Sequence, residues 1–163
     1  MVTSDTESGD DREPRPTEMD AALLRRIRAA LTPYDPDSYT LEHAWQDPPA
    51  WWFVEVSPSR ADAAAFSAAF DSWDLVSISI GKNTWFEVYG VKDEDDLAYI
   101  EQLASAVFGG DLEEVPGNPK DVGAGFARIT LADGSVVSAG AAHLPVPWKW
   151  HEHIHYVPYA ETR

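Results

Sequence analysis

The chain has 163 residues, of which 28 are acidic and 12 are basic, so its formal net charge is −16 at pH 7. A field of this sign repels nucleic acid and anionic membranes and attracts basic partners. The sequence contains no Cys, which excludes a disulfide, a thiolate zinc site and a Cys nucleophile. It also contains no run of about 18 apolar residues, so it predicts no membrane-spanning helix.

The N-terminal residues predict a disordered acidic tail over residues 1–16, because this stretch lacks aromatic residues and contains two Pro. A polar, acidic start is the opposite of a signal peptide, so we expect a cytoplasmic protein. Residues 17–163 have the length and the apolar content of one globular domain.

A helix is expected first, since Thr17 to Asp20 have the shape of a capping box and apolar residues recur at helical spacing as far as Leu31. Residues 39–45 then alternate between apolar and polar side chains, which predicts a strand. Residues 51–56 predict a second strand that is apolar on both faces at its start.

Ser57-Pro58 predicts the start of a second helix, by the rule that places a capping residue before proline. Residues 76–80 and 85–89 predict a β-hairpin around the turn at residues 81–83. A third helix is expected from Asp93 to Phe108, ended by two glycines. The buried stripe of the second helix would consist of Ala63, Phe66, Ala69, Phe70 and Trp73.

The last third of the chain predicts strands. Leu112 to Val115 predict a short edge strand, and residues 126–131 and 135–137 predict a hairpin around Asp133-Gly134. Residues 148–156 alternate again and predict a final strand. Together these elements predict a single α+β domain, with an antiparallel sheet of about five to seven strands and about three helices packed mainly on one face.

Acidic residues gather at both ends of the third helix. The run at residues 93–96 is explained by a helix start, where carboxylates interact favourably with free N–H groups, but four acids exceed what one cap requires. The surplus leaves room for a docking patch for a basic partner. The candidate acids of this patch are Asp93, Glu94, Asp95, Asp96, Asp111, Glu113 and Glu114.

Exposed aromatic residues are the candidate anchors of such a patch. Trp51 and Trp52 are adjacent on an expected strand, so one of them faces the far side of the sheet. That side is either covered by another element or available to a partner. We take Trp51 and Trp85 as the candidate partner-binding tryptophans.

The histidines His151, His153 and His155 would share one face of the last strand. Two histidines at positions i and i+2 can chelate a divalent ion, but the outer pair of three is roughly 13 Å apart. A closed site would need a further ligand, such as His143 or Glu152. A solvated strand face and a pH-sensitive interface are the alternatives.

The sequence shows no nucleophile elbow, zinc-protease motif or phosphate loop, so we expect neither an enzyme nor a cofactor. Residues 77–90, the acidic helix ending Val107-Phe108-Gly109-Gly110, and the hairpin at residues 126–137 resemble small actinobacterial immunity-type proteins of toxin–immunity loci. The resemblance covers residues 75–137 and implies a cytoplasmic antidote that plugs the active site of a toxin.

These observations predict an acidic, non-catalytic binding protein, namely an immunity protein that neutralises a basic toxin such as a nuclease. One alternative is an adaptor or assembly subunit that binds another protein through a Trp-rich sheet face. The other is a small metal- or ligand-binding enzyme that uses the histidines. In each case we expect no contact with nucleic acid or membrane, and the oligomeric state is left open.

Overall fold

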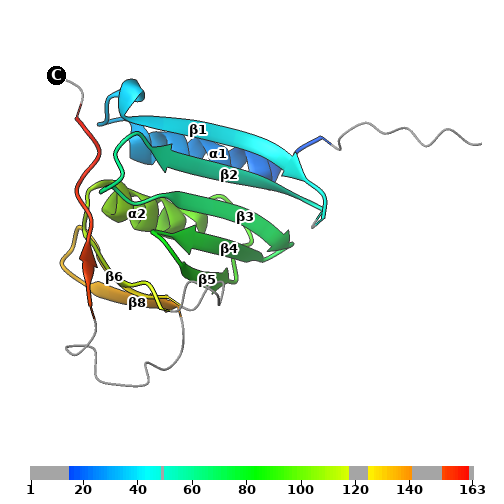
Figure 1. The fold of residues 1–163 in the computed structure, drawn as a ribbon. Coiled ribbons are helices and arrows are strands. Elements are labelled where there is room, and N and C mark those ends of the chain that lie inside the picture. The colour runs from blue at the N-terminus through cyan, green and yellow to red at the C-terminus, as the bar shows by residue number, and fades with distance from the viewer. Residues whose placement is uncertain (1–14, 49, 118–124, 141–151, 162–163) are drawn as a thin grey trace, which may run out of the picture.

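Two antiparallel sheets and two helices form the described parts of the chain in this computed structural model, which are residues 15–48, 50–117, 125–140 and 152–161 (Figure 1). The elements are α1 (Glu18–Leu31), a 3-10 turn η1 (Pro36–Ser38), β1 (Tyr39–Gln46), β2 (Trp51–Pro58), β3 (Phe66–Ser72), β4 (Leu75–Ile80), β5 (Thr84–Tyr89), α2 (Leu97–Phe108), β6 (Leu112–Val115), β7 (Phe126–Thr130), β8 (Val136–Gly140) and β9 (Ile154–His155).

The first sheet is a five-stranded meander in which each strand pairs antiparallel with the next strand in the chain. Both helices lie on the same side of this sheet, where they pack against each other (Figure 1). Their buried faces meet the inward side chains of the strands in one apolar core. The opposite side of the sheet carries no helix in the described part of the chain.

Helix α1 confirms the expected capping box. The Thr17 hydroxyl accepts a hydrogen bond from the Asp20 N–H at 3.1 Å, and the Asp20 carboxylate accepts one from the Thr17 N–H at 2.7 Å. These two bonds satisfy donors that a helix start leaves free. Leu23, Ile27 and Leu31 then fall on the buried face, as the helical spacing predicts.

The prediction of a second helix after Ser57-Pro58 is wrong, because residues 66–72 form the strand β3 at the centre of the five-stranded sheet. Phe66 and Ala68 are buried on the side of the helices, and Ser67 between them points to the other side. Alanine has the highest intrinsic helix propensity, but tertiary context overrides propensity, and here hydrogen bonding to strands on both edges outweighs it. The described residues therefore contain two α-helices in place of the three expected.

The prediction of a single sheet is also wrong, since β6 to β9 form a separate four-stranded sheet in the order β8-β7-β6-β9. Strand β6 lies between β7 and β9 and is an inner strand, not the predicted edge strand. The chain passes through α2 after β5, so it starts a second sheet instead of extending the first. Residues 148–151 of the strand predicted at residues 148–156 lie outside the described residues, as do residues 1–14 of the predicted tail, and of residues 152–156 only Ile154 and His155 form a strand.

The two sheets approach each other closely where β8 runs beside β5. A Cβ added to Gly140 would lie 2.9 Å from Cγ2 of Thr84 and 2.2 Å from the carbonyl oxygen of Gly125. Gly140 also has a φ of +97°, a conformation that other residues rarely adopt. A glycine is therefore required at this junction.

The C-terminal segment ties the second sheet back to the helices and the first sheet (Figure 1). The Tyr159 hydroxyl donates a hydrogen bond of 2.7 Å to the carbonyl of Ala64, and the Tyr159 N–H donates one of 2.9 Å to the carbonyl of Phe108. Its ring packs against Phe108 and Tyr34. The chain thus closes next to the end of α1.

Among the described residues, neither helix has the length and apolar character that crossing a bilayer requires.

Candidate functional site

We call the side of the five-stranded sheet that faces away from the helices the outer face. It carries both candidate tryptophan anchors, Trp51 on β2 and Trp85 on β5. Side chains alternate along a strand, so the buried Val54 and Ile78 point to the helices while their neighbours point outward. The outer face consists of Trp51, Phe53 and Glu55 of β2, Ser67 and Ala69 of β3, Ser77 and Ser79 of β4, and Trp85 and Glu87 of β5.

Small side chains in the middle of the outer face leave a hollow between larger aromatic ones. The hollow has a volume of about 170 Å³ and is lined by Trp51 and Phe53 on one side and by Trp85 on the other. A second hollow of about 230 Å³ shares Glu55 and Trp85 with the first and continues to the turn at residues 81–83. The two hollows form a trough across the sheet, with Trp85, 43% exposed, on its wall.

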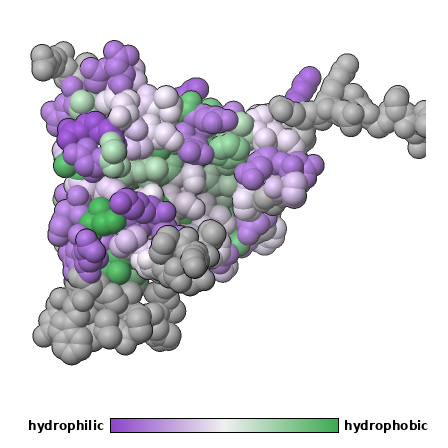
Figure 2. Space-filling model, viewed as in Figure 1, coloured by the Kyte–Doolittle hydropathy of each residue, from purple (hydrophilic) through white to green (hydrophobic). Residues whose placement is uncertain are grey.

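The outer face is acidic as well as aromatic. Strands β1 to β5 contain no Lys or Arg, whereas Glu42, Glu55 and Glu87 project from them on this side. Figure 2 views this face and shows pale and green side chains over the middle of the sheet, with purple hydrophilic residues both among them and toward the margins. The face thus combines aromatic side chains, small polar side chains and carboxylates, and aromatic residues are enriched in protein interfaces.

One hydroxyl on the outer face lacks a hydrogen bond. Ser77 is 7% exposed and lines the smaller hollow, and its Oγ has no partner within the described residues. Leaving a buried hydroxyl unsatisfied costs about 1–3 kcal/mol. A partner group that enters the hollow can supply the missing bond.

A separate aromatic hollow of about 450 Å³ lies at the edge of the sheet, near the start of α1. Four tryptophans line it together with Met19 and Phe70, and most of its lining is apolar. Trp51 lines both this hollow and the trough, whereas Trp52 and Phe70 belong to the side of the sheet that faces the helices, so this hollow is a surface distinct from the outer face. The four tryptophans are Trp45, Trp51, Trp52 and Trp73.

The acidic run at residues 93–96 was predicted to start a helix, but it precedes the helix, because α2 begins at Leu97. Asp93 Oδ1 accepts hydrogen bonds from the N–H groups of Asp95 and Asp96 at 3.0 and 3.1 Å, so it caps the turn that precedes the helix. Asp96 Oδ2 accepts a bond of 2.8 Å from the Lys92 N–H. These acids are exposed, and their side chains mainly organise their own turn.

Two arginines of α1 partly neutralise this acidic run. Arg25 forms an ion pair of 2.9 Å with Glu94, and Arg26 donates hydrogen bonds to Glu101 and to the Glu94 carbonyl, each at 3.1 Å. The arginines therefore join α1 to α2. The sequence shows both charged groups but does not show that they meet, since 69 residues separate Arg25 from Glu94.

The remaining candidate acids occupy three different environments, so the predicted patch is not one surface. Asp111 is exposed and follows the far end of α2, a helix of 12 residues and about 18 Å that begins after the acidic run. Glu113 is partly buried and contacts two histidines. Glu114 is 0% exposed, so its assignment to a partner-binding surface is wrong.

Glu114 instead binds the turn between β4 and β5. Its carboxylate accepts hydrogen bonds from the N–H groups of Lys82 and Asn83, both at 2.9 Å, from the Thr84 hydroxyl at 2.8 Å and from the Tyr156 hydroxyl. A buried carboxylate requires such partners. Its position two residues after Leu112 on a strand was the signal in the sequence that it faces the core.

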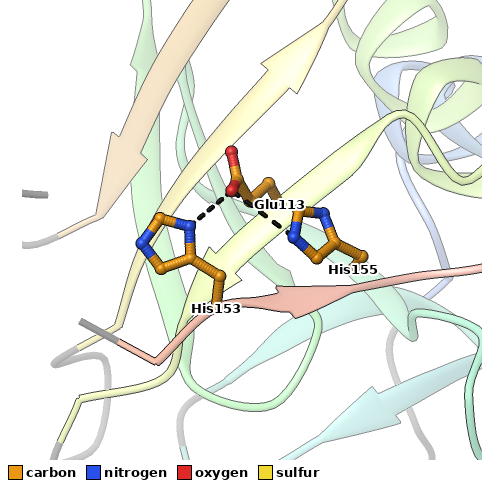
Figure 3. Close-up of side chains that lie close together, drawn as sticks. All are labelled: Glu113, His153 and His155. Carbon is orange, nitrogen blue, oxygen red and sulfur yellow. Dashed lines mark hydrogen bonds and ion pairs between the residues drawn. The ribbon is translucent and has the colours of Figure 1, made fainter. Parts of the chain in front are cut away.

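Glu113 lies on the opposite side of β6 from Glu114, beside His153 and His155 (Figure 3). His153 Nδ1 contacts Glu113 Oε1, and His155 Nε2 lies 3.7 Å from the same oxygen. The ligand atoms of the three residues all lie within 4.8 Å of one another. His151, the third predicted histidine, lies outside the described residues, and the sequence did not indicate Glu113 as the neighbour of the other two.

Comparison with protein-family models, curated proteins and solved structures finds no match to this chain. The resemblance to immunity-type proteins therefore stays a prediction, and function is argued from the geometry.

Proposed function

We propose that this protein is a non-catalytic binding protein whose outer face docks a basic protein. The observation that carries the proposal is the trough on the outer face, where Trp51 and Trp85 flank small polar residues and the strands supply carboxylates but no Lys or Arg. Tryptophan is one of the residues that most often dominate the binding energy of a protein interface.

Charge supports a basic partner over a neutral one. Glu42, Glu55 and Glu87 border the trough, and the whole chain carries a net charge of −16. Such a field accelerates the approach of a cationic partner and disfavours an acidic one. A Lys or Arg side chain laid over Trp85 would also gain a cation–π contact near Glu55.

The specific form of the proposal is an immunity protein that neutralises a basic toxin, such as a nuclease, by covering its positive cleft. It is supported by the acidic surface and by the resemblance over residues 75–137 described above. An enzyme that acts on nucleic acid needs a cationic cleft, which is complementary in charge to this outer face. Binding by this face would block that cleft without any reaction.

The test is to measure the affinity of the purified chain for the product of its neighbouring gene, with single substitutions on the outer face. We expect Trp85→Ala to weaken binding at least tenfold, as truncation of a central aromatic anchor does. The matched control is Trp73→Ala, which removes a tryptophan that is 76% exposed and does not line the trough. Binding that survives Trp85→Ala unchanged would refute this docking face.

Charge reversal separates a basic partner from an apolar interface. Glu87→Lys on the outer face should slow association and reduce its dependence on salt, whereas Asp95→Lys, in the acidic run before α2, should have a smaller effect. An affinity that depends on Trp85 but responds to neither reversal nor salt would favour the adaptor, which uses the aromatic surface without its charge.

A further inference from the structure

We propose that Glu113, His153 and His155 form a binding site for a divalent transition-metal ion of the zinc class. The proposal is independent of the outer face, because the three residues lie on the second sheet, on β6 and on or next to β9. It assigns a metal-binding site and no reaction.

Strand pairing brings the three ligands together. Glu113 of β6 lies directly opposite His155 of β9 in antiparallel register, and directly opposed side chains on one face are close neighbours. His153 lies two residues before His155, so it projects on the same face. Figure 3 shows both rings turned toward the Glu113 carboxylate. The backbone therefore positions the ligands before any ion binds.

The distances suit a single ion. Zinc binds imidazole nitrogen and carboxylate oxygen at about 2.0–2.2 Å, so tetrahedral ligand atoms lie about 3.4 Å apart. His155 Nε2 is 3.7 Å from Glu113 Oε1, and all three ligand atoms lie within 4.8 Å of one another. Small side-chain rotations can place an ion between the carboxylate and His153, which are now in direct contact.

The ligand set selects the class of metal. Two imidazoles and one carboxylate suit zinc and its neighbours nickel and copper, whereas calcium and magnesium prefer sites made only of oxygen ligands. Three protein ligands leave one tetrahedral position for water or for a group of a bound partner.

The site is sheltered on one side and open on the other. The side chains of His153 and Glu113 are 17% and 29% exposed, and that of His155 is 74% exposed. A hollow of about 550 Å³, lined in part by Glu113, His155, Arg128 and Thr130, lies beside the ligands. An ion can therefore enter from solvent and still be held by partly buried ligands.

A bound ion would also fasten the C-terminal segment. Strand β9 has two residues and pairs with β6 at only two positions, Glu113↔His155 and Glu114↔Ile154. An ion held by both strands adds a link at this short pairing. Because the site requires the folded arrangement, binding stabilises the folded chain.

The test is calorimetric titration of the chelator-treated full chain with Zn²⁺. We expect one ion per chain and a rise in the thermal midpoint with Zn²⁺. His153→Ala and His155→Ala should each weaken binding at least tenfold. Glu161→Ala is the control, since it removes an exposed carboxylate of the same C-terminal segment that is not a ligand of the site, and this variant should bind zinc as the unaltered chain does. Co²⁺ should give the strong visible absorption of a four-coordinate ion.

Glu113→Gln retains the size of the side chain, so it tests the role of the carboxylate without creating a cavity. Circular dichroism checks that each variant is folded. The absence of saturable one-to-one binding would overturn the proposal. So would folded His153→Ala and His155→Ala variants that bind zinc as tightly as the unaltered chain. Either result would leave Glu113 and His153 as a hydrogen-bonded pair without an ion.

Discussion

The hydroxyl of Thr84 donates a hydrogen bond of 2.8 Å to the Glu114 carboxylate, and this contact joins the two sheets. Thr84 begins β5 at the edge of the five-stranded sheet, and Glu114 belongs to β6 of the four-stranded sheet. Both side chains are almost fully buried. Since Glu114 also binds two N–H groups of the preceding turn, one carboxylate holds the β4–β5 hairpin against the second sheet.

Replacing Glu114 should destabilise the protein strongly. Glu114→Ala leaves the partly buried N–H groups of Lys82 and Asn83 and the buried Thr84 hydroxyl without their acceptor, so we expect the free energy of unfolding to fall by about 3 kcal/mol or more. Urea unfolding measures the loss. The control is Glu113→Ala, which removes the adjacent carboxylate on the partly exposed side of β6 and should cost about 1 kcal/mol or less. Equal losses would contradict the assigned role of Glu114.

Substitution of Gly81 should destabilise the protein, because Glu114 lies close to this glycine. Its φ is +61°, and an added Cβ would lie 2.3 Å from Glu114 Oε2. Gly81→Ala therefore combines backbone strain with displacement of the buried carboxylate. Gly134→Ala is the matched control, because Gly134 has a φ of +83° but nothing within 4 Å of the added Cβ.

We expect Gly134→Ala to lower the free energy of unfolding by about 1–2 kcal/mol, the cost of the left-handed conformation alone. Gly81→Ala should cost about 2 kcal/mol more than that. Thermal or urea unfolding of the two variants measures the difference. If the two substitutions were equally costly, the close approach of Glu114 to the turn would not matter for stability.

Stability should decrease at alkaline pH through two buried tyrosines. Burial, followed by the hydrogen bond to Glu114 and its charge, raises the pKa of Tyr156, and burial, followed by the neighbouring Tyr34, raises the pKa of Tyr159. Below a pH of about 10, both tyrosines are protonated in the folded and the unfolded chain. At higher pH the unfolded chain loses these protons first, so unfolding becomes more favourable as the pH rises.

Each of the two tyrosines should lower the free energy of unfolding by up to about 1.4 kcal/mol per pH unit above pH 10. Urea unfolding between pH 8 and pH 11 measures this slope. Tyr156→Phe and Tyr159→Phe should each flatten it, because Phe has no proton to lose. The comparison with the unaltered chain removes the general effect of charge repulsion, and an unchanged slope in both variants would count against the raised pKa values.

The two arginine contacts between the helices should differ in strength. Arg26 bonds to both Glu101 and the Glu94 carbonyl from a partly buried position, while Arg25 pairs with Glu94 where both side chains are about half exposed. We expect Arg26→Met to cost about 1 kcal/mol and Arg25→Met less than about 0.5 kcal/mol, since exposed pairs contribute little. Urea unfolding at low and high salt measures the loss of stability in both variants. A larger loss for Arg25→Met than for Arg26→Met would contradict the prediction that the Arg26 contacts are the stronger.

Local signals in the sequence predicted the elements that depend on near neighbours. The capping residues Thr17 and Asp20 indicated α1, and the turns at residues 81–83 and at Asp133-Gly134 indicated two hairpins. These predictions were confirmed because the contacts that stabilise such elements lie within a few residues. The same signals located the start of α2 less well, because the acids before it form a turn of their own.

Contacts between distant segments decided the rest. Residues 66–72 form a strand because β2 and β4 bind both of its edges, an effect that outweighs the intrinsic preference of alanine for a helix. Glu113 and Glu114 are identical neighbours in the sequence, yet one lies beside two histidines and the other is buried against Thr84. The alternation of a strand separates them, but only the pairing of β6 with β7 and β9 determines which face is buried and what each carboxylate meets.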